Sequence, residues 1–350
     1  MNLIYDYSKE RLEEVFTSNN MPKFRATQVY EALYQKLDSD FSEASNLGKE
    51  TKAFCIEKFS FKSLELIKTI ESPDTVKFLF KLDDGNLIET VLMYQSYGNS
   101  VCITSEVGCN MGCMFCASGV TKKIRDLTPG EMVLEVLAVE RYLRSLEKRV
   151  SHVVIMGIGE PFDNYDNVLE FVRIINDAKG LAIGSRHITI STCGLVPKIK
   201  EFSSFPLQVN LAISLHFAFD EKRSKYMPIN KKYNLEMLFD AIKYYYDKTN
   251  RRVTFEYILL KGINDSLDDA KKLAELVKRV NGYVNLIPYN KTMHDLDRSD
   301  DVVRDQFFDY LIKAKVNAVV RKEHGTKIDA ACGQLRVNHN PNLVVKKKTE

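Results

Sequence analysis

The spacing of apolar residues falls into three successive patterns along the chain. Through residues 1 to about 60, apolar positions recur every three or four residues, as they do on one face of a helix. In "KFRATQVYEALYQKL" that face comprises Phe24, Val29, Tyr30, Leu33 and Leu37. From residue 61 the period shifts toward two through "DTVKFLFKLDDGNLIETVLMY", where Asp84 and Gly85 mark a hairpin turn. These two patterns predict a helical domain over residues 1–60 and a β extension over residues 61–95.

The third pattern, over residues 96–340, alternates short apolar runs with amphipathic stretches. The runs read "SVCITS", "HVVIMG", "RHITIST", "QVNLAIS", "VTFEYILL", "YVNLIPY" and "NAVVRK". One helix begins at "LTPGEM", where Thr128 is the N-cap, Pro129 is the first helical residue and Glu131 completes a capping box. Another begins near "NDSLDD" and is expected to stop at Gly282. Strands that alternate with helices predict an α/β fold with a helix-covered parallel sheet, and about six such units predict a partial or complete βα barrel.

Composition and charge exclude several classes of protein. A chain of 350 residues with 45% hydrophobic content buries a full core. Charges interrupt "MNLIYDYSKERLEE" where a signal peptide would be apolar, and no apolar run approaches the roughly 18 residues of a membrane span. We therefore expect a cytoplasmic protein without a membrane partner. The net charge of +3 permits an anionic partner without requiring one, and "TKKIR" and the tail over residues 341–350 are local basic patches.

Three of the seven cysteines, Cys109, Cys113 and Cys116, are spaced C-x3-C-x2-C. An odd, uneven set of cysteines without a secretory signal argues against a disulfide framework and for metal or redox chemistry. Thiolate ligands favour zinc or an iron–sulfur cluster. A structural zinc site needs four ligands, and the next candidates, among them His216 and Cys193, are distant in the sequence. A four-iron cluster held by three cysteines leaves one iron open for an outside ligand, and we favour this interpretation.

Polar residues follow the apolar runs at five places. The cysteine loop follows "VCITS", "GIGEP" follows "HVVIM", "STCG" follows "HITI", "SLH" follows "NLAI" and "PYN" follows "VNLI". In βα barrels the loops after the strands' carboxyl ends build the active site. Any one of these loops could be an ordinary turn, but five on one rim predict a functional site.

The cysteine spacing, on a loop after the first barrel strand, closely resembles the radical S-adenosylmethionine (SAM) superfamily. "GIGEP" resembles the superfamily's glycine-rich stretch, where the missing Cβ lets the backbone approach the methionine amino group of SAM. "KIDAACGQL", with "VCITSEVGC", "MGIGEPFDNYDNV", "HITISTCGLVPKI", "AISLH", "RSKYMPIN" and "NLIPYN", resembles the RlmN/Cfr family of radical SAM RNA methyltransferases over most of the chain. The resemblance implies a monomer with a partial (βα)6-type radical SAM barrel, a [4Fe-4S] cluster and two SAM molecules per turnover.

The reaction that the resemblance implies is methylation of an adenine ring carbon in RNA: C2 in 23S rRNA and tRNA for RlmN, or C8 for Cfr. Adenine C2 is not a nucleophile, so a radical route is required. In the family's mechanism Cys332 takes a methyl group from one SAM, and a radical made by reductive cleavage of a second SAM removes hydrogen from it. The carbon radical adds to the ring. Cys102 then attacks the sulfur of Cys332, which forms a transient disulfide and releases the product.

The same resemblance assigns roles to other residues. Cys109, Cys113 and Cys116 hold the cluster, and Glu89 accepts a proton. The positions that match SAM contacts are Gly159, Glu160, Ser191, Ser214, Leu215, His216 and Asn290. The helical N-terminal domain is expected to grip the RNA, and a donor such as flavodoxin to supply electrons.

Three alternatives stay open at this stage. "GEP" and the basic stretch before "DAACGQL" favour RlmN over a Cfr-like enzyme, whose C8 methylation confers antibiotic resistance. A radical SAM activase or other small-molecule enzyme would lack both the N-terminal domain and Cys332. An RNA-binding module with a structural metal would bind zinc, which does not absorb visible light, whereas an iron–sulfur cluster does. The unusual stretches "SLHFAFDEKRSKYMPIN" and "GVTKKIRDL" bear on RNA contacts more than on the radical chemistry.

Overall fold

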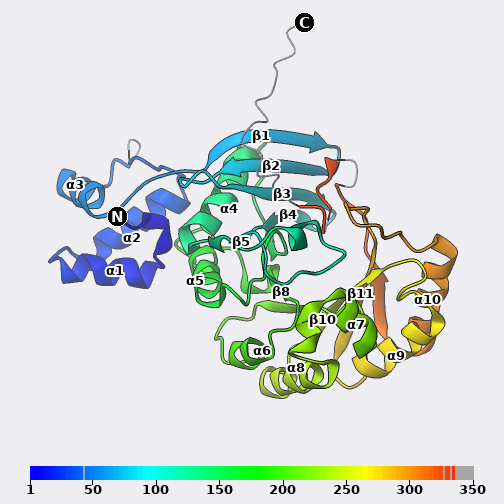
Figure 1. The fold of residues 1–350 in the computed structure, drawn as a ribbon. Helices are drawn as coiled ribbons and strands as arrows, with labels where there is room; N and C mark the ends of the chain where they lie inside the picture. Colours follow the sequence, from blue (N-terminus) through cyan, green and yellow to red (C-terminus); the bar gives the residue numbers. More distant parts are fainter. Residues whose placement is uncertain (42–43, 326–327, 332, 336–350) are drawn as a thin grey trace, which may run out of the picture.

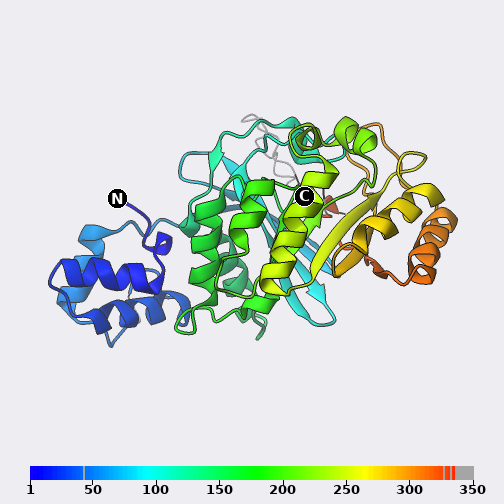
Figure 2. The same ribbon diagram turned by 90° about the horizontal axis from the view of Figure 1, so that it is seen from below.

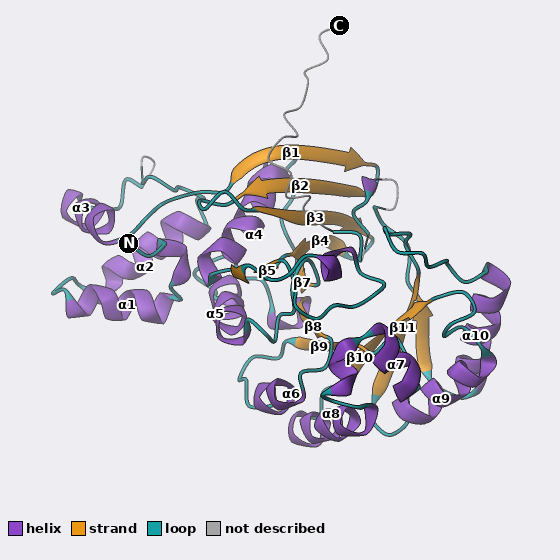
Figure 3. Cartoon of the chain, viewed as in Figure 1, coloured by secondary structure: helices purple, strands orange, loops and turns teal. Residues whose placement is uncertain are grey.

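The computed structural model describes residues 1–41, 44–325, 328–331 and 333–335. Its centre is a sheet of ten strands in the order β1-β2-β3-β4-β7-β8-β9-β10-β11-β12, which runs from β1 at the top of Figure 3 to the barrel strands below. A separate pair joins β5 (Glu106–Val107) to β6 (Arg125–Asp126). The ten-stranded sheet therefore carries the main architecture.

The parallel part of the sheet is the predicted barrel. Its strands are β4 (Gly98–Ile103), β7 (His152–Ile155), β8 (Ile188–Thr192), β9 (Asn210–Ser214), β10 (Val253–Leu259), β11 (Gly282–Pro288) and β12 (Asn317–Val320). Each neighbouring pair is parallel, and each strand matches one of the seven apolar runs. Within the described residues β1 and β12 end the sheet without pairing to each other, so the barrel is partial.

Helices connect successive parallel strands and cover the outside of the barrel (Figure 1). They are α4 (Pro129–Arg144), α5 (Tyr165–Asn176), α6 (Val196–Phe202), α7 (Asp220–Tyr226), α8 (Leu235–Thr249), α9 (Leu267–Val277) and α10 (Asp301–Lys313), with the short 3-10 turns η2 (Ala117–Val120), η3 (Ser185–His187) and η4 (Pro228–Lys231). The capping box at Thr128 and Glu131 is confirmed at the start of α4. No helix among the described residues is long and apolar enough to cross a membrane.

One predicted helix end is wrong. Helix α9 ends at Val277, and Gly282 is the first residue of β11 instead of a helix stop. A Cβ on Gly282 would lie 2.6 Å from both the Phe255 ring and the Val277 side chain. The glycine is therefore explained by close packing between strand and helix, which its position in the sequence does not reveal.

The β extension continues the barrel sheet. Strands β1 (Glu65–Ser72), β2 (Thr75–Lys81) and β3 (Leu87–Gln95) are antiparallel, and β3 pairs with β4. Gly85 adopts φ +85° in the predicted hairpin turn between β2 and β3. Because β3 leads directly into β4, Val91 and Met93 pair with the first barrel strand, and the Glu89 carbonyl accepts from the Thr104 hydroxyl just after that strand.

The first 60 residues form η1 (Ile4–Asp6), α1 (Lys9–Ser18), α2 (Lys23–Tyr34) and α3 (Lys49–Lys58), which stand to one side of the barrel in Figures 1 and 2. They attach to the outer helices, since the Tyr30 hydroxyl donates to the Ile174 carbonyl at 3.0 Å. The predicted apolar face of α2 is wrong at both ends. Phe24 is 56% exposed, and Leu37 lies beyond the helix with φ +57°.

Candidate active site

The three grouped cysteines line one cavity at the carboxyl ends of the parallel strands. Cys109, Cys113 and Cys116 lie between β5 and η2, and the cavity of about 150 Å³ extends from them to the ends of β7, β8 and β9. Backbone bonds shape their loop, because the Cys109 amide donates to the Thr121 carbonyl at 2.9 Å. A Cβ on Gly119 would lie 2.6 Å from the Cys113 carbonyl oxygen, so the turn requires glycine.

The chemistry of this loop fits an iron–sulfur cluster. Burial raises the pKa of the Cys109 thiol to about 12 and that of Cys113 well above its usual range. A bound cation reverses this effect, because a coordinating thiol loses its proton to the metal. In the part of the chain that the structure describes, no three His, Cys, Asp or Glu side chains are grouped to hold a single metal ion. A four-iron cluster spreads its cysteine ligands over separate irons, so it does not need such a group.

The glycine-rich stretch after β7 forms the next wall of this cavity. Gly159 has φ +111°, and a Cβ there would lie 2.7 Å from both the Ser105 hydroxyl and Glu106 Cβ. The fully buried Glu160 carboxylate accepts hydrogen bonds from the Cys193 amide at 2.7 Å and the Phe162 amide at 3.0 Å. Glu160 thus ties the stretch after β7 to the one after β8, so it organises the wall that it also lines.

Three of the predicted SAM-contacting residues lie together on the following strands. Ser191 on β8 and Ser214 on β9 place their hydroxyl oxygens 3.2 Å apart. His216 follows with φ +58° and an edge-to-face contact on the Phe115 ring, with the two centroids 4.9 Å apart. Burial lowers the pKa of His216 to about 3, and its Nδ1 accepts from the Ile258 amide. The imidazole is therefore neutral, with its proton on Nε2.

Leu215 differs from its neighbours because its side chain is fully buried in the main hydrophobic core. It is not among the residues that line this cavity, and only its main chain contributes nearby: its carbonyl accepts from Arg223 Nε at 3.1 Å. The geometry brings together Ser214 and His216 but leaves the Leu215 side chain outside the site.

A second, smaller cavity adjoins the first. It measures about 30 Å³ and is lined by Cys102 on β4, Asn290 after β11, Ala330 and Ala331, and it shares Met156, Ile287 and Arg321 with the cysteine-lined cavity. Asn290 is buried, and its Oδ1 has no hydrogen-bond partner among the described residues. A buried amide oxygen aimed at such a site fits contact with a bound small molecule.

Cys332, the predicted methyl carrier, lies outside the described residues. Its described neighbours border the site, since Ala331 lines the smaller cavity and Gly333 lines the cysteine-lined one. The Ala117 amide donates to the Gly333 carbonyl at 2.7 Å, and the Ser118 hydroxyl donates to the Leu335 carbonyl at 2.7 Å. These bonds attach residues 333–335 to η2, directly after the cysteine loop.

Glu89 lies in a different pocket from Cys102. On β3 its carboxylate forms an ion pair with Lys77 Nζ at 3.2 Å, and both side chains are nearly buried. Lys77 Nζ also donates to the Asp329 carbonyl at 3.0 Å, and Gln334 lines the same pocket. The geometry thus places Glu89 against the described residues on both sides of Cys332 without bringing it into the cavity that Cys102 lines.

Sequence reasoning missed two buried groups at this site. Glu106 is buried and pairs with Lys123 Nζ at 2.8 Å; its pKa is raised by burial to about 7. Arg223 is fully buried and donates to the carbonyls of Cys193, at 2.6 Å, and Leu215. Arg223 belongs to the charge-rich stretch "DEKRSK", which the sequence presents as solvated surface, and Glu106 is a lone carboxylate beside the cysteine loop. A buried arginine that binds loop carbonyls has no signal of its own in the sequence.

Comparison with known proteins agrees with this geometry. Residues 103–277 match the Radical SAM superfamily, and residues 1–57 match the ribosomal RNA large subunit methyltransferase N-terminal domain. The chain is 55% identical over 340 residues to a Listeria welshimeri protein named "Probable dual-specificity RNA methyltransferase RlmN", covering 95% of this chain and 93% of that protein. A Spiroplasma citri protein of the same name is 52% identical, covering 97% and 98%.

A solved structure extends the likeness to the whole fold. The crystal structure of a radical SAM methyltransferase from Sphaerobacter thermophilus superposes with a TM-score of 0.92 at 38% identity, covering 96% of this chain and 99% of that one. Membership in the superfamily implies a [4Fe-4S] cluster and SAM as cofactors. The chain belongs to the RlmN family of radical SAM RNA methyltransferases.

Proposed function

We propose that this enzyme methylates C2 of an adenine in 23S rRNA and of an adenine in tRNA. The observation that carries the proposal is the shared wall between the cavity of Cys109, Cys113 and Cys116 and the cavity of Cys102. A cluster-bound cofactor and a reactive thiol would meet across Met156 and Ile287. The two relatives named as dual-specificity enzymes support the choice of both RNAs.

The chain's own residues would hold the cofactors in the larger cavity. Cys109, Cys113 and Cys116 would bind the cluster, and the cluster with SAM would supply a carbon radical able to remove hydrogen from an S-methyl group. The polar wall of Ser191, Ser214 and His216 would orient the sugar and amino acid parts of SAM, while Gly159 keeps its backbone accessible. Two SAM molecules are consumed per turnover, one as methyl donor and one as radical source.

Two cysteines carry the group transfer in this proposal. The Cys332 thiolate takes the methyl group of SAM, and after loss of one hydrogen atom its methylene carbon would bond to adenine C2. This addition leaves an unpaired electron on the ring, and a one-electron acceptor, for which the oxidised cluster would serve, must remove it before the adduct is resolved. Cys102 then attacks the Cys332 sulfur: a sulfur–sulfur bond forms, the carbon–sulfur bond breaks, and its electron pair stays with the carbon, which takes up a proton. A thiol reductant must restore both thiols before the next turnover. Cys102 is 7% exposed at a cavity wall, which suits a thiolate that acts only on a bound adduct.

Glu89 is proposed to accept the proton that C2 loses. Its carboxylate forms an ion pair with Lys77 Nζ in a nearly buried position. The bond from Lys77 to the Asp329 carbonyl links this acceptor to the segment before Cys332.

Residues 1–60 are proposed as an accessory domain that binds RNA, ahead of a catalytic unit over residues 96–340, and the enzyme is proposed to act as a monomer with a flavodoxin-like electron donor. Adenine C2 is shielded in a stacked helix, so the target base must be extruded or lie in a loop before the thiol can reach it. The match of residues 1–57 to a ribosomal RNA methyltransferase domain supports the RNA-binding role.

Mass spectrometry of adenosines tests the proposal. Cells that lack the enzyme and cells that express it are compared, with 23S rRNA and tRNA digested separately. We expect 2-methyladenosine in both RNAs only when the enzyme is present. A methyl group at C8 would instead establish the Cfr-like alternative, and methylation of 23S rRNA alone would remove tRNA from the proposal.

A further inference from the structure

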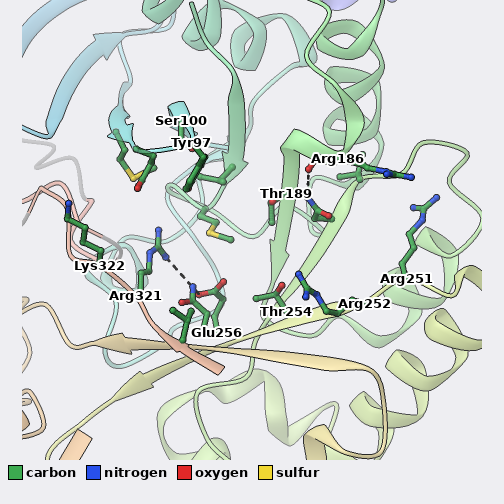
Figure 4. Close-up of a pocket in the computed structure, with 18 of the residues that line it drawn as sticks. Tyr97, Ser100, Arg186, Thr189, Arg251, Arg252, Thr254, Glu256, Arg321 and Lys322 are labelled. Carbon is green, nitrogen blue, oxygen red and sulfur yellow. Dashed lines mark hydrogen bonds and ion pairs between the residues drawn. The ribbon is translucent and has the colours of Figure 1, made fainter. Parts of the chain in front are cut away.

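The cavity drawn in Figure 4 is distinct from the cysteine-lined one and larger than it. It measures about 940 Å³; Thr189, Asn210 and Thr254 line it near the amino-terminal ends of β8, β9 and β10, and Met156 and Arg321 line it just after β7 and β12. It shares Met156, Glu256 and Arg321 with the cysteine-lined cavity and Met93, Lys322 and His324 with the cavity of Cys102. This cavity therefore adjoins both parts of the candidate active site through shared wall residues.

Cations dominate the rim of this cavity. Arg186, Arg251, Arg252, Arg321 and Lys322 line it, and we call this set the basic mouth. Its one acidic lining residue, Glu256, is already bonded by Asn285 Nδ2 at 2.8 Å and lies 3.9 Å from Arg321. Within the described part of the chain, Arg186, Arg251 and Arg252 form no ion pair. Arg186, Arg251 and Arg252 thus carry positive charge that no carboxylate among the described residues neutralises.

The three arginines are also held in place. Arg186 Nε donates to Gln208 Oε1 at 2.9 Å, Arg251 Nη1 donates to the Leu207 carbonyl at 2.8 Å, and the Arg252 guanidinium lies 4.8 Å from the centre of the Tyr283 ring. These contacts use a minority of the five N–H donors of each guanidinium. A role in fixing the turns before β9 and β10 would explain the hydrogen bonds of Arg186 and Arg251. It would not explain why three arginines without an ion pair among the described residues lie around one opening.

A row of three rings in contact, formed by Tyr97, His152 and His187, begins at this cavity. Tyr97 lines the cavity with 63% of its surface exposed, and its ring meets the edge of His152 with centroids 4.9 Å apart. His152 stacks on His187 at 4.3 Å, with an angle of 24° between the rings. Exposed rings beside cations are the surface that single-stranded RNA uses, because bases stack on the rings while phosphates pair with arginine.

We propose that the basic mouth binds the single-stranded RNA next to the target adenine, with Arg186, Arg251 and Arg252 on phosphates and Tyr97 stacked on a flanking base. The inference rests on the proposed function, and it adds the path by which the RNA reaches the thiols. The target base would pass Met156 into the cavity of Cys102 while its neighbours remain at the basic mouth. A strand in this position needs no contact with the cysteine loop.

A charge-neutralising variant tests the phosphate contacts. Arg186→Gln/Arg251→Gln/Arg252→Gln is compared with Lys271→Gln/Lys278→Gln/Arg279→Gln, which removes the same charge from the exposed residues in and just after helix α9. The affinity of the full-length enzyme for a fluorescent 23S rRNA fragment with the target loop is measured by anisotropy at several salt concentrations. Three lost contacts to a single strand should lower the slope of log affinity against log salt by about 2, and weaken binding roughly tenfold or more near physiological salt.

The α9 control should bind within about twofold of the original enzyme, since it changes net charge without touching the basic mouth. Equal weakening in both variants, or an unchanged slope in the arginine variant, would overturn the inference. Because two of the arginines bond to the chain before β9, thermal melting checks that the variant folds. If the arginine variant does not fold, the test uses Tyr97, because its exposed ring does not pack in the hydrophobic core.

Tyr97→Leu should weaken binding of the same fragment about tenfold through loss of a stacked base, whereas Tyr97→Phe should bind normally. Equal affinities for the Leu and Phe variants would contradict the stacking role. The proposed function is judged separately, by whether the original enzyme forms 2-methyladenosine in that fragment. An enzyme that methylates the fragment but binds it independently of the basic mouth would defeat only the inference, and one that binds through the basic mouth without methylating would defeat only the function.

Discussion

Glu135 shows how one buried carboxyl joins three elements around the first barrel strand. From α4 its Oε2 accepts hydrogen bonds from the Thr90 hydroxyl on β3 and from the Thr104 amide at the end of β4. Burial raises the pKa of Glu135 well above its ordinary value of 4.5. The folded protein therefore retains this proton at pH values where the unfolded chain has lost it.

The pH dependence of stability follows from that difference. A folded-state pKa above the unfolded one stabilises the protein fully at low pH, and this stabilisation is lost progressively as the pH rises above about 4.5. Glu135→Gln keeps the acceptor oxygen and removes the titration. We expect the free energy of unfolding of Glu135→Gln, relative to the original protein, to rise between pH 5 and pH 8 in urea titrations. A constant difference across that range would show that the carboxyl is ionised when folded.

A substitution of Gly159 adds one methyl group to the wall of the cysteine-lined cavity. A methyl group there would lie 2.7 Å from Ser105 and Glu106. The backbone φ of +111° is also one that residues other than glycine rarely adopt. Gly159→Ala should weaken SAM binding at least tenfold, an effect of roughly 1.4 kcal/mol, while iron content stays normal. Equilibrium dialysis with labelled SAM and an iron assay measure the two effects. A variant that lost iron and SAM together would point instead to general disruption of the cysteine loop.

Cys102 separates formation of the RNA adduct from its release. If this thiolate only resolves the adduct, Cys102→Ala should accumulate protein joined to RNA, which denaturing gels reveal as a shifted band that RNase removes. The bond is a thioether, so added thiol should not release it. Cys332→Ala, and the double variant, should form no adduct. Normal yields of methylated RNA from Cys102→Ala would exclude the resolving role.

Among the elements, helix α4 has the clearest local cause. The Glu131 amide donates to the Thr128 hydroxyl, and the Glu131 carboxylate accepts from the Thr128 amide at 2.9 Å. Arg125 adds two bonds to the same carboxylate, at 2.7 and 2.8 Å. The helix start is thus held by both the capping box and a paired cation.

Thr128→Ala should lower the free energy of unfolding by about 1 kcal/mol, because it removes the hydroxyl that satisfies a helix-terminal amide. Thr128→Ser keeps that hydroxyl and should lie close to the original protein. Urea unfolding of the two variants measures the difference. If both lose the same stability, the threonine methyl group and not the cap is responsible.

Elements were predicted well where the signal is local and poorly where it depends on packing. The seven barrel strands follow from continuous apolar runs, because a strand buried on both faces has no polar alternation. The end of α9 was misplaced because Gly282 serves the contact with Phe255, which only the fold brings near. The grouping of Cys109, Cys113 and Cys116 at one cavity was predicted from their spacing, whereas Arg223 was missed because it bonds to main-chain carbonyls of two separate loops.

At the scale of the whole molecule, two surfaces are available to one RNA: the basic mouth and the N-terminal helices. Phe24 on α2 is 56% exposed, and the Arg25 guanidinium lies over its ring at 4.8 Å. The exposure that contradicted its predicted place in the core fits an aromatic contact with RNA. Deletion of residues 1–60 would test this poorly, because it would also uncover α5 at Ile174 and the start of α4, where the Gly130 amide donates to Asp6.

Point substitutions keep the molecule intact. Phe24→Ala/Arg25→Gln should weaken binding of the 23S rRNA fragment about tenfold, since a stacked base contributes about 1–3 kcal/mol. Tyr244→Ala/Lys248→Gln is the matched control, because Lys248 lies 5.9 Å from the centre of the exposed Tyr244 ring on the outer helix α8. Anisotropy measures both, and melting temperatures check their folding. Because the two surfaces lie on separate elements, combining Phe24→Ala/Arg25→Gln with Tyr97→Leu should add their losses in binding free energy. Equal affinities of the Phe24 variant and its control would show that the N-terminal helices do not contact the RNA through this pair.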